Sequence, residues 1–266
     1  MARLVVFLGL CVCLLGACVP AKKLVYFQQG DELKNRKNIP KDTVLRTHDL
    51  NIREYRIQPL DLLSVQFETL SDESDLFDFL AKLNPQGRMS NPNMAAANGI
   101  LVDKAGELEY PVLGKIKVGG LTLFEAQDTL KRIASRYIQD VAVRVRMLNF
   151  RYTVLGEVRG EQTVTSTNTR LTMSEAIALA GGFGEMADRA NVKVIRQNEN
   201  VAEIYYINLL EEQFIESKYY YVQQNDVIVV PPLKQRTFRA YWTTNIGIIT
   251  ATLSFLVLIV TLADRY

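Results

Sequence analysis

Side chains that commonly perform catalysis or bind metal ions are scarce in this chain of 266 residues. It contains a single histidine, His48, and its three cysteines, Cys11, Cys13 and Cys18, all lie near the N-terminus. His48 has no cysteine and no acidic cluster at ligand spacing, so it fits neither a metal site nor a catalytic triad. Gly181-Gly182-Phe183-Gly184 follows a predicted helix, which places its amides at the wrong end to bind phosphate. We therefore predict no enzyme, no metal and no cofactor, although carboxylates paired only in space for glycoside cleavage stay open.

Cys18 stands in a sequence context that suits acylation of its thiol. One positive charge at Arg3 precedes an apolar stretch, residues 4–15, which is too short to span a bilayer, as in a signal peptide. The stretch ends in Leu15-Gly16-Ala17-Cys18, where small residues directly precede the cysteine. This motif resembles the bacterial lipobox, whose cysteine becomes the lipidated first residue of the mature protein. We predict a signal peptide at 1–17 and a lipidated N-terminus with an extended tether at 18–54.

The C-terminal segment has the composition of a membrane-spanning helix. No charged residue occurs from Ile246 to Ala263. As a helix this stretch would extend about 27 Å, close to the roughly 30 Å of a bilayer's hydrocarbon core. Tyr241 and Trp242 lie where an interfacial aromatic belt is expected, and Tyr266 lies at the opposite edge. A buried helix would need a large surrounding domain, so we predict a transmembrane helix at 241–263.

A stripe of mostly small or hydroxylated residues runs along this predicted helix. Its members alternate at spacings of four and three residues: Thr243, Gly247, Thr250, Ser254, Val257, Thr261 and Asp264. Small residues let other membrane helices approach closely, whereas hydroxyl groups could instead face water inside a ring of helices. A lone anchor that carries Thr and Ser by chance is the third interpretation. Since one helix cannot enclose a pore, the pore interpretation also requires oligomerisation.

The chain between the two attachments is predicted to fold as α+β modules after a polar tether. Alternating apolar residues predict a strand over 61–68, and helical periodicity predicts a helix over 71–83. Residues 84–99 are dense in Asn, Pro, Gly and Ala, which predicts a long loop.

Two stretches then recur in the same order along the chain. They are Tyr110-Pro111-Val112-Leu113-Gly114 with Tyr152-Thr153-Val154-Leu155-Gly156, and Leu121-Thr122-Leu123-Phe124-Glu125-Ala126 with Leu171-Thr172-Met173-Ser174-Glu175-Ala176. Each Thr-x-x-Glu forms a predicted capping box at a helix start, and an alternating strand follows each helix. The duplication predicts two small modules that meet near Phe150, the second ending at Pro231-Pro232. It specifies a fold and no chemistry.

With these motifs the sequence resembles polysaccharide export proteins of the outer-membrane lipoprotein type, the Wza family. The run from Tyr55-Arg56-Ile57-Gln58-Pro59-Leu60-Asp61 to about Met147 resembles the export domain, and Gly156 to Arg196 resembles the SLBB (soluble-ligand-binding β-grasp) domain. The resemblance implies an export domain at 55–150, a β-grasp-like domain at 151–238 and then the transmembrane helix. Family members usually have Gly-Asp where this chain has Leu60-Asp61 and Asn225-Asp226, so we expect a different turn there. One β-grasp copy is evident, so the body should be shorter than in members with more.

The resemblance implies an oligomeric, porin-like channel that exports capsular or exopolysaccharide from the periplasm to the cell surface. Subunits would form a homo-oligomeric ring in the outer membrane, lipid-anchored at Cys18, with the body in the periplasm. The implied partners are the polysaccharide, membrane lipids and an inner-membrane co-polymerase that regulates chain length. A doubly anchored scaffold or glycan-binding module without a pore stays open, as does retention of the helix in the inner membrane. The net charge of +2, with acids and bases interspersed, indicates no nucleic-acid partner.

Replacing the proposed lipid acceptor tests the N-terminal prediction. Cys18→Ser should leave the chain unacylated and poorly processed, because the thiol that would carry the lipid is gone. Mass spectrometry of the mature N-terminal peptide measures this, with Cys13→Ser as the control that should keep normal acylation. An unmodified mature N-terminus at another residue in the wild type would contradict the prediction.

Overall fold

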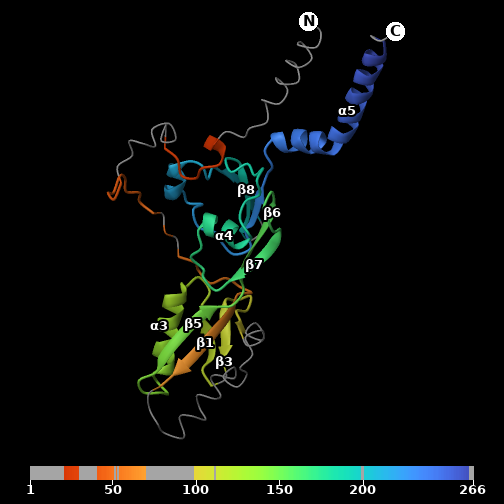
Figure 1. Cartoon of the computed structure of the whole chain (residues 1–266). Coiled ribbons are helices and arrows are strands. Elements are labelled where there is room, and N and C mark those ends of the chain that lie inside the picture. The colour runs from red at the N-terminus through yellow and green to blue at the C-terminus, as the bar shows by residue number, and fades with distance from the viewer. Residues whose placement is uncertain are drawn as a thin grey trace.

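In the computed structural model the chain forms two α+β modules followed by a long C-terminal helix (Figure 1). The structure describes residues 21–29, 41–50, 52, 54–69, 99–110, 112–198 and 201–263. Several sequence predictions lie outside these residues: Cys18, Asp264, Tyr266, the helix at 71–83 and nearly all of the loop at 84–99. The predicted α+β class with a C-terminal apolar helix is confirmed.

The first module is built around strand β1 (Leu62–Glu68). β1 pairs antiparallel with β2 (Ile100–Leu101) and with β5 (Ala142–Met147). Its burial alternates as the sequence predicted, with three side chains no more than 2% exposed: Leu63, Val65 and Phe67. A period of two is the pattern of a strand with one face in the core.

A hairpin and a helix complete the first module. Strands β3 (Glu107–Tyr110) and β4 (Gly114–Lys117) pair with each other, and helix α3 (Leu123–Ala134) packs against β5. α3 buries three residues spaced by four, so that one helical face meets the core: Ala126, Leu130 and Ala134.

The second module contains a five-stranded mixed sheet in the order β7-β6-β10-β8-β9. Its strands are β6 (Phe150–Gly156), β7 (Gln162–Ser166), β8 (Val192–Asn198), β9 (Val201–Ile207) and β10 (Val227–Val230). β10 pairs parallel with β6 and antiparallel with β8, so the last strand of the module lies at its centre. Helix α4 (Met173–Leu179) is bound to the sheet through the buried Tyr152 hydroxyl, which donates to the Ala176 carbonyl at 3.0 Å.

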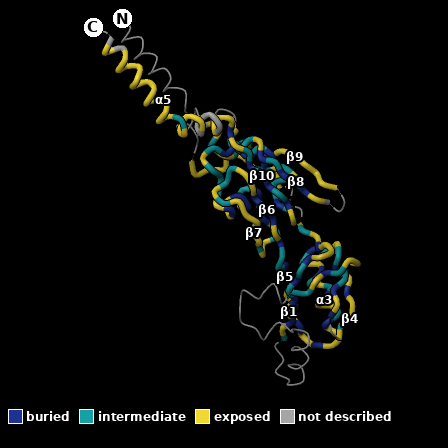
Figure 2. Tube along the Cα trace, turned by 90° about the vertical axis from the view of Figure 1, so that its right-hand side faces the viewer, coloured by how far each residue is buried: buried dark blue, intermediate teal, exposed yellow. Residues whose placement is uncertain are grey.

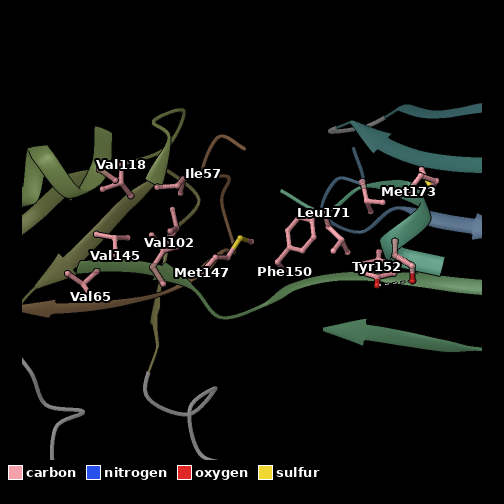
Figure 3. Close-up of a cluster of buried hydrophobic side chains, with 14 of the residues drawn as sticks. Ile57, Val65, Val102, Val118, Val145, Met147, Phe150, Tyr152, Leu171 and Met173 are labelled. Carbon is pink, nitrogen blue, oxygen red and sulfur yellow. Dashed lines mark hydrogen bonds between the residues drawn. The ribbon is translucent and has the colours of Figure 1, made fainter. Parts of the chain in front are cut away.

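The two modules meet at a short connection. β5 ends at Met147 and β6 begins at Phe150. Figure 3 shows buried side chains continuing from Val145 and Met147 on one side to Phe150 and Tyr152 on the other. The rings of Tyr55 and Phe150 meet edge to face with their centroids 6.0 Å apart, which joins the start of the first module to the second.

Each module has the same tight turn before its central strand. The two turn sequences are Tyr55-Arg56-Ile57-Gln58-Pro59-Leu60-Asp61 and Tyr220-Tyr221-Val222-Gln223-Gln224-Asn225-Asp226, and β1 and β10 follow them. The Gln58 amide donates to Asp61 Oδ2 at 2.7 Å, and the Gln223 amide donates to Asp226 Oδ2 at 2.8 Å. Our sequence prediction missed this repeat because one copy opens its module and the other closes it.

The turns keep a left-handed residue where the family pattern has glycine. Leu60 has φ 72° and Asn225 has φ 62°. Glycine adopts this conformation at little cost and asparagine tolerates it, whereas leucine is strained there. The backbone conformation at both sites therefore suits glycine, the residue that the family pattern has there.

In both modules the turn is joined to the start of the helix. The Ile57 amide donates to the Leu121 carbonyl at 2.8 Å, and the Val222 amide donates to the Leu171 carbonyl at 2.9 Å. Leu121 and Leu171 directly precede the capping threonines. The modules thus share one arrangement of turn, strand and capped helix, with the order along the chain permuted.

Helix α5 (Gln235–Ala263) follows β10 after Pro231-Pro232. It begins six residues before the predicted span at 241–263, because the linking residues also adopt helical structure. Figure 1 shows α5 extending from the second module, away from the first.

Both predicted capping boxes are present, and their removal should cost stability without affecting chemistry. Thr122 and Thr172 each accept from the amide of the Glu three residues later at 3.2 Å, and that Glu accepts from the Thr amide at 2.8 Å. Thr122→Ala or Thr172→Ala should each lower the free energy of unfolding by about 1 kcal/mol. Denaturant titration measures this, and Thr→Ser at each site is the matched control that retains the cap. Loss of export at unchanged stability would show that these threonines have another role.

Candidate functional site at the membrane-attachment end

Helix α5 presents an apolar surface that none of the described residues buries. Among the described residues, only the stretch Tyr241–Ile259 is long and apolar enough to cross a membrane, with a mean hydropathy of 1.7, and none of it is buried. Figure 2 shows it exposed along its length. Tyr241 and Trp242 are 63% and 40% exposed at the end nearer the second module, where the belt was predicted. Length and composition therefore agree with the predicted transmembrane helix.

The predicted stripe lies entirely on α5 within the described residues. The hydroxyls of Thr250, Ser254 and Thr261 each donate to backbone carbonyls three or four residues earlier, at 2.8 to 3.0 Å. Thr252, which is outside the stripe, does the same. The hydroxyl hydrogens are therefore satisfied within the helix, and each oxygen keeps lone pairs for water or a neighbouring helix.

Two other stripe members leave free space beside the helix. Apart from the adjoining residues and backbone of its own helix, a Cβ atom added at Gly247 would meet no atom within 4 Å, and Val257 is 53% exposed. This surface can admit another helix at close range or remain open. The surroundings of α5 in the assembled protein decide between these two roles.

The start of α5 is fastened to the second module. Arg236 Nη1 lies 2.8 Å from Glu157 Oε2, and the Leu233 amide donates to the Met186 carbonyl at 2.7 Å. These contacts tie the helix start to the loops around the sheet.

The N-terminal segment is fastened to the same module. Residues 21–29 include a short helical turn, η1 (Ala21–Lys23), and the Gln28 amide donates to the Leu210 carbonyl at 2.6 Å. The Arg189 guanidinium lies 4.7 Å from the centroid of the Tyr26 ring. Residues 21–29, which follow Cys18 in sequence, thus contact the same module that bears α5.

The described residues between 41 and 58 form a segment that we call the strap. Side chains of the strap contact the second module, and the sequence did not indicate these contacts. Arg46 donates to both carboxylate oxygens of Glu212 at 2.7 and 2.6 Å. His48 Nε2 lies 2.7 Å from Glu212 and Nδ1 lies 2.7 Å from Glu216, both in the short helix η4 (Glu212–Glu216). The predicted tether therefore has little secondary structure, but it is bound to the second module by charge.

The contacts of His48 require a protonated ring. A neutral imidazole donates from only one nitrogen, so two carboxylate contacts need both nitrogens protonated. The hydrogen bonds to Glu212 and then Glu216 raise the pKa of His48 above its ordinary value of 6.5. Hydrogen bonds from Arg46 and His48 lower the pKa of Glu212 below its ordinary 4.5. Both ring nitrogens of His48 thus contact carboxylates, and the side chain acts as a cation in a clasp.

A polar cleft of about 530 Å³ lies where the strap, the start of α3 and the second module meet. Its lining includes Arg56, whose Nη1 lies 3.6 Å from Glu125 Oε2, and also Lys218 and Tyr221. Its described lining residues include no histidine or cysteine, and the described part of the chain has no cluster of three or more metal-ligating side chains. The cleft offers polar and charged side chains for contact with a ligand.

The strap should detach as the pH rises. The raised pKa of His48 adds stability that is complete below pH 6.5 and is lost as pH rises through the folded-state value. The lowered pKa of Glu212 adds stability that is complete above 4.5 and is lost on acidification. Trypsin cleavage after Lys41 and Arg46, which an attached strap hinders, should therefore be slower at pH 6 than at pH 8, after correction for the pH dependence of trypsin on an unfolded peptide. His48→Gln should remove the difference, and equal protection of the wild type at both pH values would contradict the clasp.

Comparison with known proteins covers both modules. Residues 51–148 match the family described as polysaccharide biosynthesis/export protein, and residues 151–230 match the SLBB domain. The EPS I polysaccharide export outer membrane protein EpsA of Ralstonia solanacearum is 28% identical over 170 residues, which cover 60% of this chain and 43% of the relative. The protein of the same name from Ralstonia nicotianae is 32% identical over 107 residues, 38% of this chain and 28% of the relative.

These matches assign the chain to a family, although it spans less than half the length of the curated relatives it matches. The matches to the export and SLBB regions meet at the β5–β6 connection, where the structure changes from one module to the next. The family is one of transport proteins, which agrees with the prediction that the chain is not an enzyme. The chain belongs to the polysaccharide biosynthesis/export protein family.

Proposed function

We propose that this chain is a subunit of an oligomeric outer-membrane conduit that exports capsular or exopolysaccharide from the periplasm to the cell surface. The observation that carries the proposal is the uncovered apolar helix α5, attached directly to a body made of an export module and an SLBB module. The names of both relatives describe polysaccharide export at an outer membrane.

The arrangement of the modules suits a protein that reaches from a membrane into the periplasm. α5 and the segment 21–29 are both fastened to the second module, while the export module lies at the end remote from α5 (Figure 1). With α5 in the outer membrane and Cys18 lipidated, the export module would point inward. The end of the export module that is remote from α5 would then contact an inner-membrane co-polymerase that regulates chain length.

A conduit requires a homo-oligomeric ring, because one helix cannot enclose a path for a polymer. In the ring that we propose, Thr243, Gly247, Thr250, Ser254, Val257 and Thr261 face the lumen. Hydroxyl oxygens with free lone pairs keep a lumen wet without binding sugars tightly. The Ile, Leu and Phe side chains of the other faces would contact lipid and neighbouring subunits.

A doubly anchored scaffold or glycan-binding module without a pore is the second candidate. The polar cleft beside Tyr221 and Arg56 favours it, since such a cleft offers a ring face and charged groups for contact with a glycan. Counting subunits in the detergent-extracted particle by electron microscopy separates the candidates. A ring supports the conduit, whereas a monomer or dimer excludes it.

Thiol labelling tests which face of α5 is wet. Single Cys substitutions at Thr250, Ser254 and Thr261 should react with a membrane-impermeant thiol reagent in the assembled protein, because these positions would face an aqueous lumen. Cys at three matched positions should stay protected by lipid or by neighbouring subunits: Ile249, Phe255 and Ile259. Equal protection of all six in an actively exporting assembly would show a dry packing seam in place of a lumen.

A further inference from the structure

The second module leaves two strand edges open. In the order β7-β6-β10-β8-β9, strands β7 and β9 are the outer strands. Among the described residues, no backbone hydrogen bond joins β9 to any strand except β8, or β7 to any strand except β6. Each edge therefore presents free amides and carbonyls that another strand can pair with.

The composition of β9 is typical of a strand whose free edge pairs with another strand. Its sequence, Val-Ala-Glu-Ile-Tyr-Tyr-Ile, contains one charged residue and no proline. Val201, Ile204 and Tyr206 are 63%, 61% and 64% exposed, although strands with a free edge usually carry lysine, proline or a bulge that prevents pairing. β7 has neither charge nor proline in Gln162–Ser166. Apart from Glu203 in β9, the two edges lack the charged residues and prolines that keep edge strands apart.

Strand directions decide which edges can pair between copies. β7 is antiparallel to β6, β6 is parallel to β10, β10 is antiparallel to β8, and β8 is antiparallel to β9. β9 and β7 therefore run in opposite directions. In a ring whose axis follows α5, rotation preserves the sense of every strand, so β9 of one copy meets β7 of the next as an antiparallel pair.

The position of the edges fits the same symmetry. Figure 2 shows β9 and β7 on opposite sides of the second module, with α5 leaving from one end. Side-by-side copies would therefore bring all their α5 helices to one side, as a common membrane requires. Each copy contributes one edge of each kind, so a closed ring leaves no edge unpaired.

Side chains on the joining edges are compatible. The register places Ile204 opposite Ile195 in β8, and across β10 and β6 the same face continues to Thr163 in β7. Ile204 and Thr163 thus project from one face of the sheet. Pairing would set β-branched Thr side chains beside Ile204 and Tyr206, a favourable combination across strands.

We infer that β9 pairs antiparallel with β7 of a second copy of this chain, so that the five-stranded sheet continues from subunit to subunit. The inference rests on the proposed ring and names the surface that builds it. It assigns the exposed side of Val201–Ile207 to a subunit contact.

Disulfide cross-linking of the full-length chain in membranes tests this contact. Cys is introduced at Ile204 or Tyr206 together with Thr163 or Thr165, giving four double variants that cover neighbouring registers. Within one copy the two edges are four strand spacings apart, about 19 Å, which is too far for a disulfide. A bond can therefore form only between copies.

At least one double variant should give a ladder of covalent oligomers on a non-reducing gel, ending at the number of subunits counted in the wild-type ring. Each of the four single variants should stop at a dimer or below, because a ladder needs a cysteine on both edges. Phe124→Cys combined with Thr163→Cys is the matched control, since Phe124 is 70% exposed in the first module, and it should give no ladder.

The outcomes separate this inference from the function on which it rests. A wild-type ring in which no β9–β7 pair cross-links, or in which the Phe124 control cross-links equally, overturns the β9–β7 contact and leaves the conduit standing. A wild-type particle that is monomeric overturns both.

Discussion

Two buried carboxylates close the turns on which both modules depend. Asp61 and Asp226 are 2% and 0% exposed, and a carboxylate withdrawn from water is costly unless hydrogen bonds replace the lost hydration. Asp61 accepts from the Tyr55 hydroxyl and the Gln58 amide at 2.7 Å each, and burial still raises its pKa above the ordinary value. Asp226 accepts two hydrogen bonds from the guanidinium of Arg196, at 2.9 and 2.7 Å. These bonds fix the direction in which β1 and β10 leave their turns.

The direction of strand β10 also determines where helix α5 begins. β10 lies between β6 and β8, and only a short linker that begins with Pro231-Pro232 separates it from α5. Two contacts then fasten this linker and the helix start: the Leu233 amide with the Met186 carbonyl, and Arg236 with Glu157. The orientation of α5 relative to the body is thus set by packing within the second module.

A single copy of the chain exposes apolar surface of two chemical kinds. The side chains of α5 have their backbone groups already paired within the helix, so lipid can cover them. On β9 the exposed side chains lie beside backbone amides and carbonyls that are unpaired on the free edge. Lipid cannot form hydrogen bonds with these groups, but another strand can. The two surfaces therefore suit different partners, which in our proposals are a membrane for the helix and a strand of a second copy for β9.

Local chemistry in the sequence determined the elements whose stability is local. The capping boxes at Thr122 and Thr172, the alternation of β1 and the apolar length of α5 depend on neighbours within a few residues, and the structure contains each of them. The left-handed Gly181 and Gly182 after α4 belong to the same class, with φ of 91° and 82°.

Only the tertiary structure decided the contacts between distant residues. His48 and Glu212 are 164 positions apart, so no spacing rule could pair the lone histidine with its carboxylates. The repeated Gln-x-x-Asp turn was hidden because permuted modules place it first in one and last in the other. The central place of β10, with β7 and β9 left as edges, arises because its parallel partner β6 comes from the start of the module. Strand order depends on which apolar faces pack together over long separations, and a linear pattern carries no record of that choice.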